Sequence, residues 1–279
     1  MNRRFAAVLV PLLALSLAAC TGDDDKPADP KAALVASTSG LKGGDYSFTA
    51  SLPGDSVAKG TVHTPSKTAS LDFDSVEEGA KAKMQFRITD PDRYVKMTID
   101  MSEAVKQAES LAALGDDPQS AKVIEGLKAM IELFSGKQWL KLDMAKVTND
   151  DFKIGIEDPD LTGAAGLFGG VTTAERKGPV ITGTLDATVV KDDAHLLGTS
   201  VFKGAEPAQA KAIPYEATLD VDGRLTKLVL DVPKTTDAPA GKLTMEVSGY
   251  GAAAKQDAPP AAETKEMPES AYEMINGKN

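Results

Sequence analysis

The chain has 279 residues, of which 42% are hydrophobic, a single cysteine and a formal net charge of -10. An acidic surface repels nucleic acid and anionic lipid head groups, so neither is expected as an electrostatic partner. One cysteine excludes an intrachain disulfide, so stability must come from a packed core, which a chain of this length can bury.

The first twenty residues predict an export signal. Arg3 and Arg4 form a short positive stretch, and an apolar run over residues 5–17 follows. This run is shorter than the roughly 20 apolar residues of a membrane-spanning helix and is typical of a signal-peptide core. It ends in Leu17-Ala18-Ala19-Cys20, which resembles the lipobox of bacterial lipoproteins. The resemblance implies cleavage before Cys20 and diacylglycerol on its sulfur.

The mature chain is expected to divide into three parts. Removal of the signal peptide, residues 1–19, takes two arginines away and shifts the net charge from -10 to -12. Residues 20–30 are expected to form the acylated cysteine and a flexible tether, anchored by about 0.8 kcal/mol per buried methylene. A folded domain is expected over residues 31–251. Residues 252–279, rich in Ala, Pro, Glu and Lys, predict a low-complexity C-terminal tail that is mostly disordered.

Apolar and polar residues alternate along most of the expected domain, which is the pattern of strands with one covered face. The alternation predicts strands at residues 46–52, 69–73, 84–88, 95–101, 181–189, 213–221, 228–232 and 243–247. Asp222-Gly223 predicts a hairpin turn within residues 213–232, because both residues tolerate positive φ.

Helical patterns lie between the two groups of strands. The first is carried by residues at helical spacing, namely Ala104, Ala108, Leu111 and Ala112. A second helix is predicted to begin at Asp117-Pro118 and end at Ser135-Gly136. Its apolar stripe consists of Val123, Ile124, Leu127, Met130, Ile131 and Phe134. Residues 136–143 return to strand, and the apolar, glycine-rich residues 161–170 predict a short, mobile helix. This order favours an α+β fold, a curved antiparallel sheet with helices packed on its concave face.

The order of elements, together with the lipobox, resembles the LppX/LprAFG group of actinobacterial lipoproteins, which share the LolA-like half-barrel fold with LolA, LolB and the sensor RseB. The matching features are a helix before Asp45, the meander over residues 46–101, two helices ahead of GKQWLKLD at residues 136–143, and the hairpin at residues 214–225. The resemblance covers roughly residues 31–250. It implies an apolar cavity between sheet and helices that holds the acyl chains of a lipid or lipoglycan, and an envelope transporter as a partner.

The resemblance carries over no fixed ligand residues, because such cavities are lined by generic apolar side chains. The residues expected to line the cavity are Met84, Phe86, Val95, Met97, Ile99, Leu127, Met130, Ile131, Phe134, Leu161, Leu167 and Phe168. Methionine suits a deformable pocket. The same residues would serve equally well in a solid core, so the residues alone leave both interpretations open.

Residues that carry catalysis are missing from the sequence. His63 and His195 are isolated, no glycine-x-serine-x-glycine elbow is present, and Cys20 is used for acylation. Residues 220–223 (DVDG) lack the terminal glutamate of a calcium loop, and the glycines of residues 161–170 lack the lysine of a phosphate loop. The sequence therefore predicts no enzyme, no metal and no cofactor beyond the diacylglycerol.

Two functions remain. The first is a lipid-anchored protein on the extracytoplasmic side of the cell membrane that binds or carries lipid or lipoglycan acyl chains. The second is a non-carrier sensor or scaffold that binds a membrane or envelope protein, as the likeness to RseB allows. An apolar cavity of several hundred Å³ would favour the first, and an exposed apolar patch over a filled core would favour the second.

Overall fold

The computed structural model describes residues 29–77, 80–100, 102–103, 105–106, 110, 118–190, 196, 199–236 and 238–277. The signal peptide, Cys20, the tether up to residue 28, Met101 and His195 lie outside the described residues, as do Ala104, Ala108, Leu111 and Ala112 of the first predicted helix. The described residues between 102 and 110 are helical, and they include Ser102, Lys106 and Ser110.

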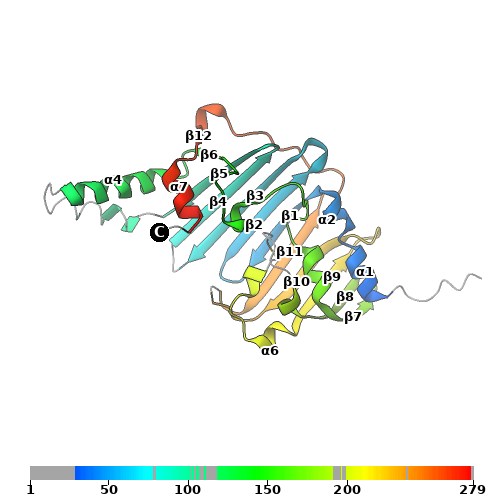
Figure 1. Cartoon of the computed structure of the whole chain (residues 1–279). Helices are drawn as coiled ribbons and strands as arrows, with labels where there is room; N and C mark the ends of the chain where they lie inside the picture. The colour runs from blue at the N-terminus through cyan, green and yellow to red at the C-terminus, as the bar shows by residue number, and fades with distance from the viewer. Residues whose placement is uncertain are drawn as a thin grey trace, which may run out of the picture.

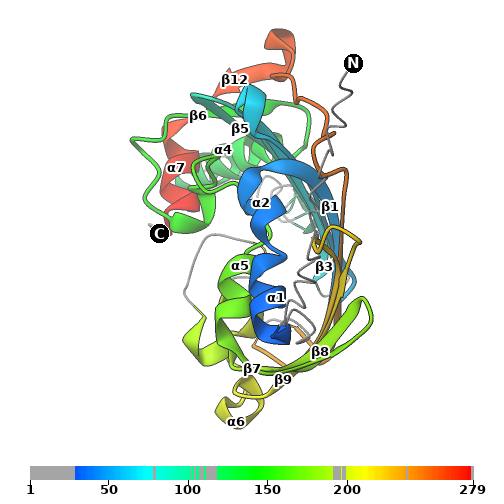
Figure 2. The same ribbon diagram turned by 90° about the vertical axis from the view of Figure 1, so that its right-hand side faces the viewer.

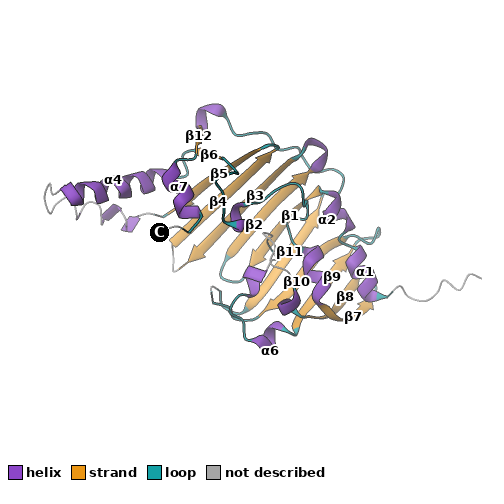
Figure 3. Cartoon of the chain, viewed as in Figure 1, coloured by secondary structure: helices purple, strands orange, loops and turns teal. Residues whose placement is uncertain are grey.

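The described residues form an α+β fold around one open, mixed sheet of twelve strands (Figures 1 and 3). The strands are β1 (Asp45–Leu52), β2 (Ser56–His63), β3 (Thr68–Glu77), β4 (Ala80–Thr89), β5 (Asp92–Ile99), β6 (Trp139–Leu142), β7 (Val171–Lys177), β8 (Val180–Leu185), β9 (Ile213–Leu219), β10 (Leu225–Val232), β11 (Gly241–Ser248) and β12 (Thr264–Glu266). The α-helices are α1 (Pro30–Ala36), α2 (Ser39–Gly43), α4 (Pro118–Leu133), α5 (Ala164–Leu167), α6 (Pro207–Ala210) and α7 (Glu269–Ile275). Short 3-10 helices are η1 (Thr64–Ser66), η2 (Asp150–Phe152), η3 (Phe168–Gly170), η4 (Ala187–Val189), η5 (Thr199–Phe202) and η6 (Ala261–Glu263).

Two meanders meet at the middle of the sheet. The strand order is β12-β6-β5-β4-β3-β2-β1-β11-β10-β9-β8-β7, so the first and second halves of the chain join where β1 pairs with β11. All pairs are antiparallel except β12 with β6, which is parallel. The predicted α+β class is confirmed, and the expectation of a fully antiparallel sheet is wrong at this one edge.

Most predicted strands are present, but the runs predicted to end at residues 101 and 221 end at Ile99 and Leu219, and a third ends earlier still. The run expected up to Val189 ends at Leu185, because the Asp186 carboxylate accepts the backbone N–H of Thr188 at 2.9 Å and caps η4. The predicted hairpin is formed by β9 and β10, with Gly223 at φ 76° in the turn. Strands β2 and β7 were missed by the pattern of alternation.

The two faces of the sheet differ in burial. Tyr46, Phe48 and Ala50 of β1 are buried and point to what we name the covered face. Residues between them in the strands point to the outer face, where Lys59 of β2 is exposed. Figure 2 shows α1, α2 and α5 together on one side of the sheet, with α1 next to its β7 end and α2 next to β1.

The C-terminal residues are folded, so the prediction of a mostly disordered tail over residues 252–279 is wrong for residues 252–277. The chain leaves β11, crosses the ends of the strands and adds β12 to the edge of β6 (Figure 1). Helix α7 then buries Ala271, Tyr272 and Ile275, and the Tyr272 hydroxyl accepts the N–H of Asp143 at 2.6 Å. A few well-spaced apolar residues are enough to dock a segment whose overall composition is polar.

Candidate functional site

Residues 161–170 form a tightly bound turn and two short helices. The carboxylate of Asp160, itself 3% exposed, accepts the backbone N–H groups of Thr162 (3.2 Å), Gly163 (3.1 Å) and Ala165 (2.9 Å). Gly163 takes φ 74°, a left-handed conformation that favours glycine, and begins α5. These contacts fix the segment at its start.

Tyr46 ties the same turn to the centre of the sheet. Its hydroxyl donates to the carbonyl of Pro159 at 2.8 Å and accepts the N–H of Leu161 at 3.0 Å. Burial raises the pKa of the Tyr46 phenol far above its ordinary value, and the nearby Asp160 carboxylate adds to this. The bond to Pro159 requires the neutral hydroxyl, which the raised pKa preserves, so the interaction is structural at all ordinary pH values.

The segment belongs to the core. Leu161 is 3% exposed, and Leu167 and Phe168 are completely buried. The Phe168 ring lies 6.5 Å from that of Tyr215 on β9. The expectation of a mobile helix that covers a cavity entrance stays a prediction, and this packing makes opening costly, because it would expose three buried apolar side chains, each worth roughly 1.5–3 kcal/mol.

The β3–β5 part of the covered face is less completely buried. Register places Phe73 opposite Met84, and Ala82 opposite Ile99. The first three are half-buried and Ile99 is 37% exposed. We name these four residues the open strip. Next to it, Met97 pairs with Met84 and is buried.

The neighbouring row of the same strands is covered. Phe86 and Val95 face each other and are buried. The Phe152 ring lies 6.0 Å from that of Phe86, so the segment after β6 packs over this row. The open strip is thus a less buried margin of a face that is otherwise packed.

Helix α4 has the bounds that the sequence predicts, but most of its apolar stripe is not packed over the sheet. Phe134, directly after the helix, is 6% exposed, whereas Met130 is 36% exposed. Ile124, Leu127 and Ile131 are half-buried and stand outside the core cluster. Nothing is described of the Val123 side chain. Figure 1 shows the helix projecting beyond the β6 side of the sheet.

The twelve residues expected to line one cavity therefore fall into three places. Leu161, Leu167 and Phe168 pack near β1 and β9. Strands β2 and β3 separate this region from β4 and β5. The residues of β4 and β5 form the second group and those of α4 and Phe134 the third. The second and third groups meet at the base of α4, where the N–H of Ile99 donates to the carbonyl of Phe134 at 3.0 Å.

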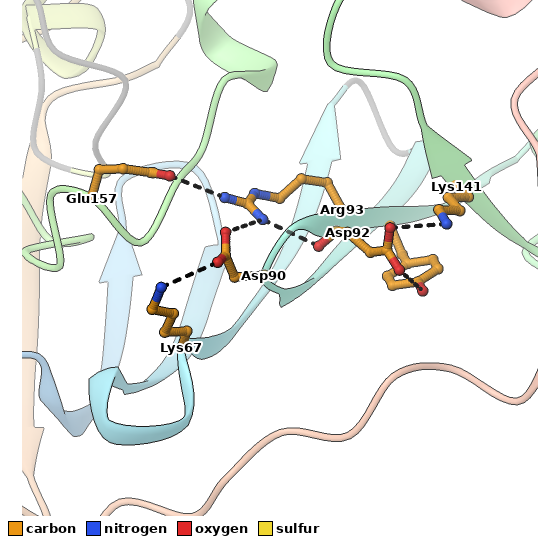
Figure 4. A network of polar contacts seen from close by, with 7 residues as sticks. Lys67, Asp90, Asp92, Arg93, Lys141 and Glu157 are labelled. Atoms are coloured by element: carbon orange, nitrogen blue, oxygen red, sulfur yellow. Dashed lines mark hydrogen bonds and ion pairs between the residues drawn. The ribbon is translucent and has the colours of Figure 1, made fainter.

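A polar network at the β4–β5 turn was not predicted (Figure 4). Asp90 lies 3.6 Å from Lys67 Nζ and 3.8 Å from Arg93 Nη1. Arg93, whose side chain is 11% exposed, also donates to Glu157 at 3.4 Å. The network ties the turn to the segment that covers Phe86.

A second ion pair adjoins it. Lys141 Nζ lies 2.9 Å from the carboxylate of Asp92, which also accepts the Tyr94 hydroxyl at 3.2 Å. The hydrogen bond from Lys141 lowers the pKa of Asp92 and raises that of Lys141. Both groups are held in their charged forms, which suits a structural tie and not proton transfer.

The outer face carries a hollow of about 450 Å³ across β8–β11. Its charged side chains are compensated: Lys242 lies 2.6 Å from Asp231, and Lys227 lies 3.7 Å from Glu246 beside the hollow. The sequence signal, polar residues alternating with core residues on these strands, is the ordinary one for a solvated face. It holds no residue of the predicted cavity.

Metal and membrane-spanning features are missing from the part of the chain that the structure describes. No group of three or more His, Cys, Asp and Glu side chains is placed to hold a metal there. His63 Nδ1 instead lies 2.6 Å from the hydroxyl of Ser66 in η1. No helix within the described ranges has both the length and the apolar character to cross a bilayer.

No protein-family model and no curated protein matches the sequence. The class of the protein is therefore defined by its fold, an α+β protein with an open, mixed twelve-stranded sheet.

Proposed function

We propose that this chain is a lipoprotein, anchored through Cys20 on the outer side of the cytoplasmic membrane, that binds or carries the acyl chains of a lipid or lipoglycan. The proposal includes a LolA-like half-barrel, with the covered face as its concave side. It involves binding without catalysis, and an envelope transporter as the partner that supplies or receives the lipid.

The observation that carries lipid binding is the open strip. Its side chains are apolar and it adjoins the core: Phe73 and Met84 pack against the core cluster, while Ile99 remains 37% exposed. Exposed apolar surface next to a core is typical of ligand and partner sites. Met84 adds a flexible, polarisable side chain that adapts to an acyl chain. The ligand belongs here, because residues 161–168 already fill the β1–β9 side.

A matched pair of substitutions tests the site. Ile99 and Val76 are 37% and 38% exposed, but Ile99 points to the covered face and Val76 to the outer face. Native mass spectrometry of wild type, Ile99→Gln and Val76→Gln, after incubation with membrane extract, should show lower acyl-lipid occupancy in the Ile99 variant alone. Wild-type protein that never carries lipid would end the carrier proposal.

The second candidate is a non-carrier sensor or scaffold for an envelope protein. The observation that favours it is α4, where Ile124, Leu127 and Ile131 stand outside the core cluster of the described residues and Met130 is 36% exposed. Absence of lipid from wild-type protein, with α4 still required for partner binding, would favour this alternative.

A further inference from the structure

Burial on the covered face falls along the strands towards Ile99. On β4, Ile88 and Phe86 are buried, whereas Met84 is half-buried. On β5, Met97 is buried, whereas Ile99 is 37% exposed. An apolar chain that binds by covering exposed atoms therefore starts from the Ile99 end of this face.

The opposite end of the face is closed by the polar network at the β4–β5 turn (Figure 4). The Arg93 guanidinium lies 3.8 Å from Asp90 and 3.4 Å from Glu157. Glu157 belongs to the segment that follows Phe152, so the network holds this segment against the turn. A chain that entered from the turn would have to separate these ion pairs, which again favours the Ile99 end.

Phe152 stands where the half-buried part of the face meets the buried part. Its ring lies 6.0 Å from that of Phe86, and its own side chain is half-buried. Phe86 follows Met84 of the open strip by two residues on β4, so both side chains point to the covered face, about 7 Å apart along the strand. An apolar chain that lies on the open strip along β4 meets the Phe152 ring next.

The loop that carries Phe152 is held by the end of the chain. Oδ1 of Asn276, directly after α7, accepts the N–H groups of Thr148 at 2.8 Å and Asn149 at 3.2 Å. Its Nδ2 donates to the carbonyl of Lys146 at 2.8 Å. The carbonyl of Asn149 in turn accepts the N–H of Phe152 at 3.2 Å. One amide side chain thus fixes three backbone groups of the loop, one of them in the residue that Phe152 contacts.

Helix α7 gives this arrangement a firm base. Its Tyr272 and Ile275 are buried, and the Tyr272 hydroxyl accepts the N–H of Asp143 at the start of the loop. The Asn149 side chain also donates to the carbonyl of Ile275 at 2.8 Å. Movement of the loop would have to break these contacts or expose buried side chains of α7, so Phe152 is held firmly in its place.

We propose that the Phe152 ring is the stop that limits how far an acyl chain reaches along the covered face, and that Asn276 is the positioning residue that holds this stop. The proposal rests on the proposed binding of acyl chains at the open strip. The chain lies with its terminal methyl group beside Met84 and leaves the face at Ile99. The site therefore takes the end of an acyl chain, over two cross-strand rows that lie about 7 Å apart.

Fatty acids that carry a diazirine on their terminal carbon test the stop, because this carbon labels the residues next to the end of the chain. The probes are added to the full acylated chain in phosphatidylcholine vesicles, and labelled residues are identified by peptide mass spectrometry. In wild type the label is expected on Met84. In Phe152→Ala the label on Phe86 should rise about fourfold or more, the gain from burying one further methylene.

A matched control removes a phenylalanine ring from the open strip itself. Phe73 pairs with Met84, so Phe73→Ala widens the strip and leaves the stop in place. It should leave the label on Met84. Phe152→Leu fills more of the same space and should give an intermediate shift, also where the alanine variant does not fold.

The positioning role has its own pair of variants. Asn276→Ala should move part of the label to Phe86, because the loop loses three hydrogen bonds. Asn276→Asp keeps the acceptor for both N–H groups and should move less. Equal label patterns in wild type and Asn276→Ala would show that Asn276 does not hold the stop.

The outcomes separate this proposal from the one on which it rests. Label that stays on Met84 in both Phe152 variants, or wild-type label that is equal on Met84 and Phe86, would overturn the stop and leave acyl binding at the open strip standing. Wild-type protein without label on the covered face would overturn the proposed acyl-chain binding, and the stop with it.

Discussion

Substitution of Asp160 by alanine should destabilise the fold strongly, although the side chain is small and takes part in no ion pair that the structure records. Its carboxylate is the acceptor for three backbone N–H groups, those of Thr162, Gly163 and Ala165. It also accepts the hydroxyl of Thr162. Alanine supplies no acceptor for the N–H groups of Thr162 and Ala165, whereas the Gly163 N–H keeps the backbone carbonyl of residue 160 at 3.1 Å.

The expected magnitude follows from burial. A buried donor left without an acceptor costs about 1–3 kcal/mol, so the N–H groups of Thr162 and Ala165 together should cost at least about 2 kcal/mol. For a domain of this size that corresponds to a fall in Tm of roughly 4–8 °C. The displaced turn would also loosen Leu167 and Phe168 from the core, which adds to the loss.

The chain contains a control with the same local geometry. Asp186 accepts the N–H and the hydroxyl of Thr188, as Asp160 does with Thr162, but it lies near the surface where water replaces lost contacts. Thermal melts followed by circular dichroism should show a much smaller shift for Asp186→Ala than for Asp160→Ala. Equal shifts would refute the reasoning from burial.

Three further results are expected. Cys20→Ala should abolish incorporation of an alkyne fatty acid and leave an uncleaved precursor on gels; retained label would disprove the lipobox assignment. Leu127→Asp on the projecting part of α4 should lower Tm far less than Phe134→Asp, which buries a charge at a cost of several kcal/mol; equal melts would contradict the placement of the helix. Burial raises the pKa of Tyr215 from 10.0 to about 12, so its contribution to stability is present below pH 10 and is lost as the pH rises from 10 to 12. Urea unfolding at pH 9 and 11.5 should accordingly show that the free energy of unfolding falls less between these two pH values in Tyr215→Phe than in wild type. An equal fall in both proteins would refute this role of Tyr215.

The strands that sequence reasoning found are those whose own side chains supply the core. Strand β2 was missed because it supplies little: a Cβ on Gly60 would lie 2.2 Å from Cε1 of Phe48, whose ring from β1 occupies the space. Strand β7 was missed because it is an edge strand with mostly exposed residues after Val171. In both cases the decisive contacts come from a neighbouring strand and leave no local pattern.

The candidate site was predictable only in part for a related reason. Composition identifies residues 161–170 as apolar, but a core segment and a movable cover have the same composition. What separates them here is long-range, the hydrogen bonds of Leu161 and Pro159 to Tyr46, more than a hundred residues away in sequence. The prediction for the C-terminal tail was wrong for the opposite reason. The average composition of the tail is polar, but Met267 and Tyr272 are buried next to the β6 edge, where β12 pairs with β6.

The two ends of the covered face therefore have different capacities for a ligand. Near β8–β10 the face is filled by Leu167, Phe168 and their neighbours, and a guest there would have to displace core side chains. At β3–β5 the open strip still exposes apolar surface, Ile99 most of all at 37%, so an acyl chain bound there would cover exposed atoms and leave the core side chains in place.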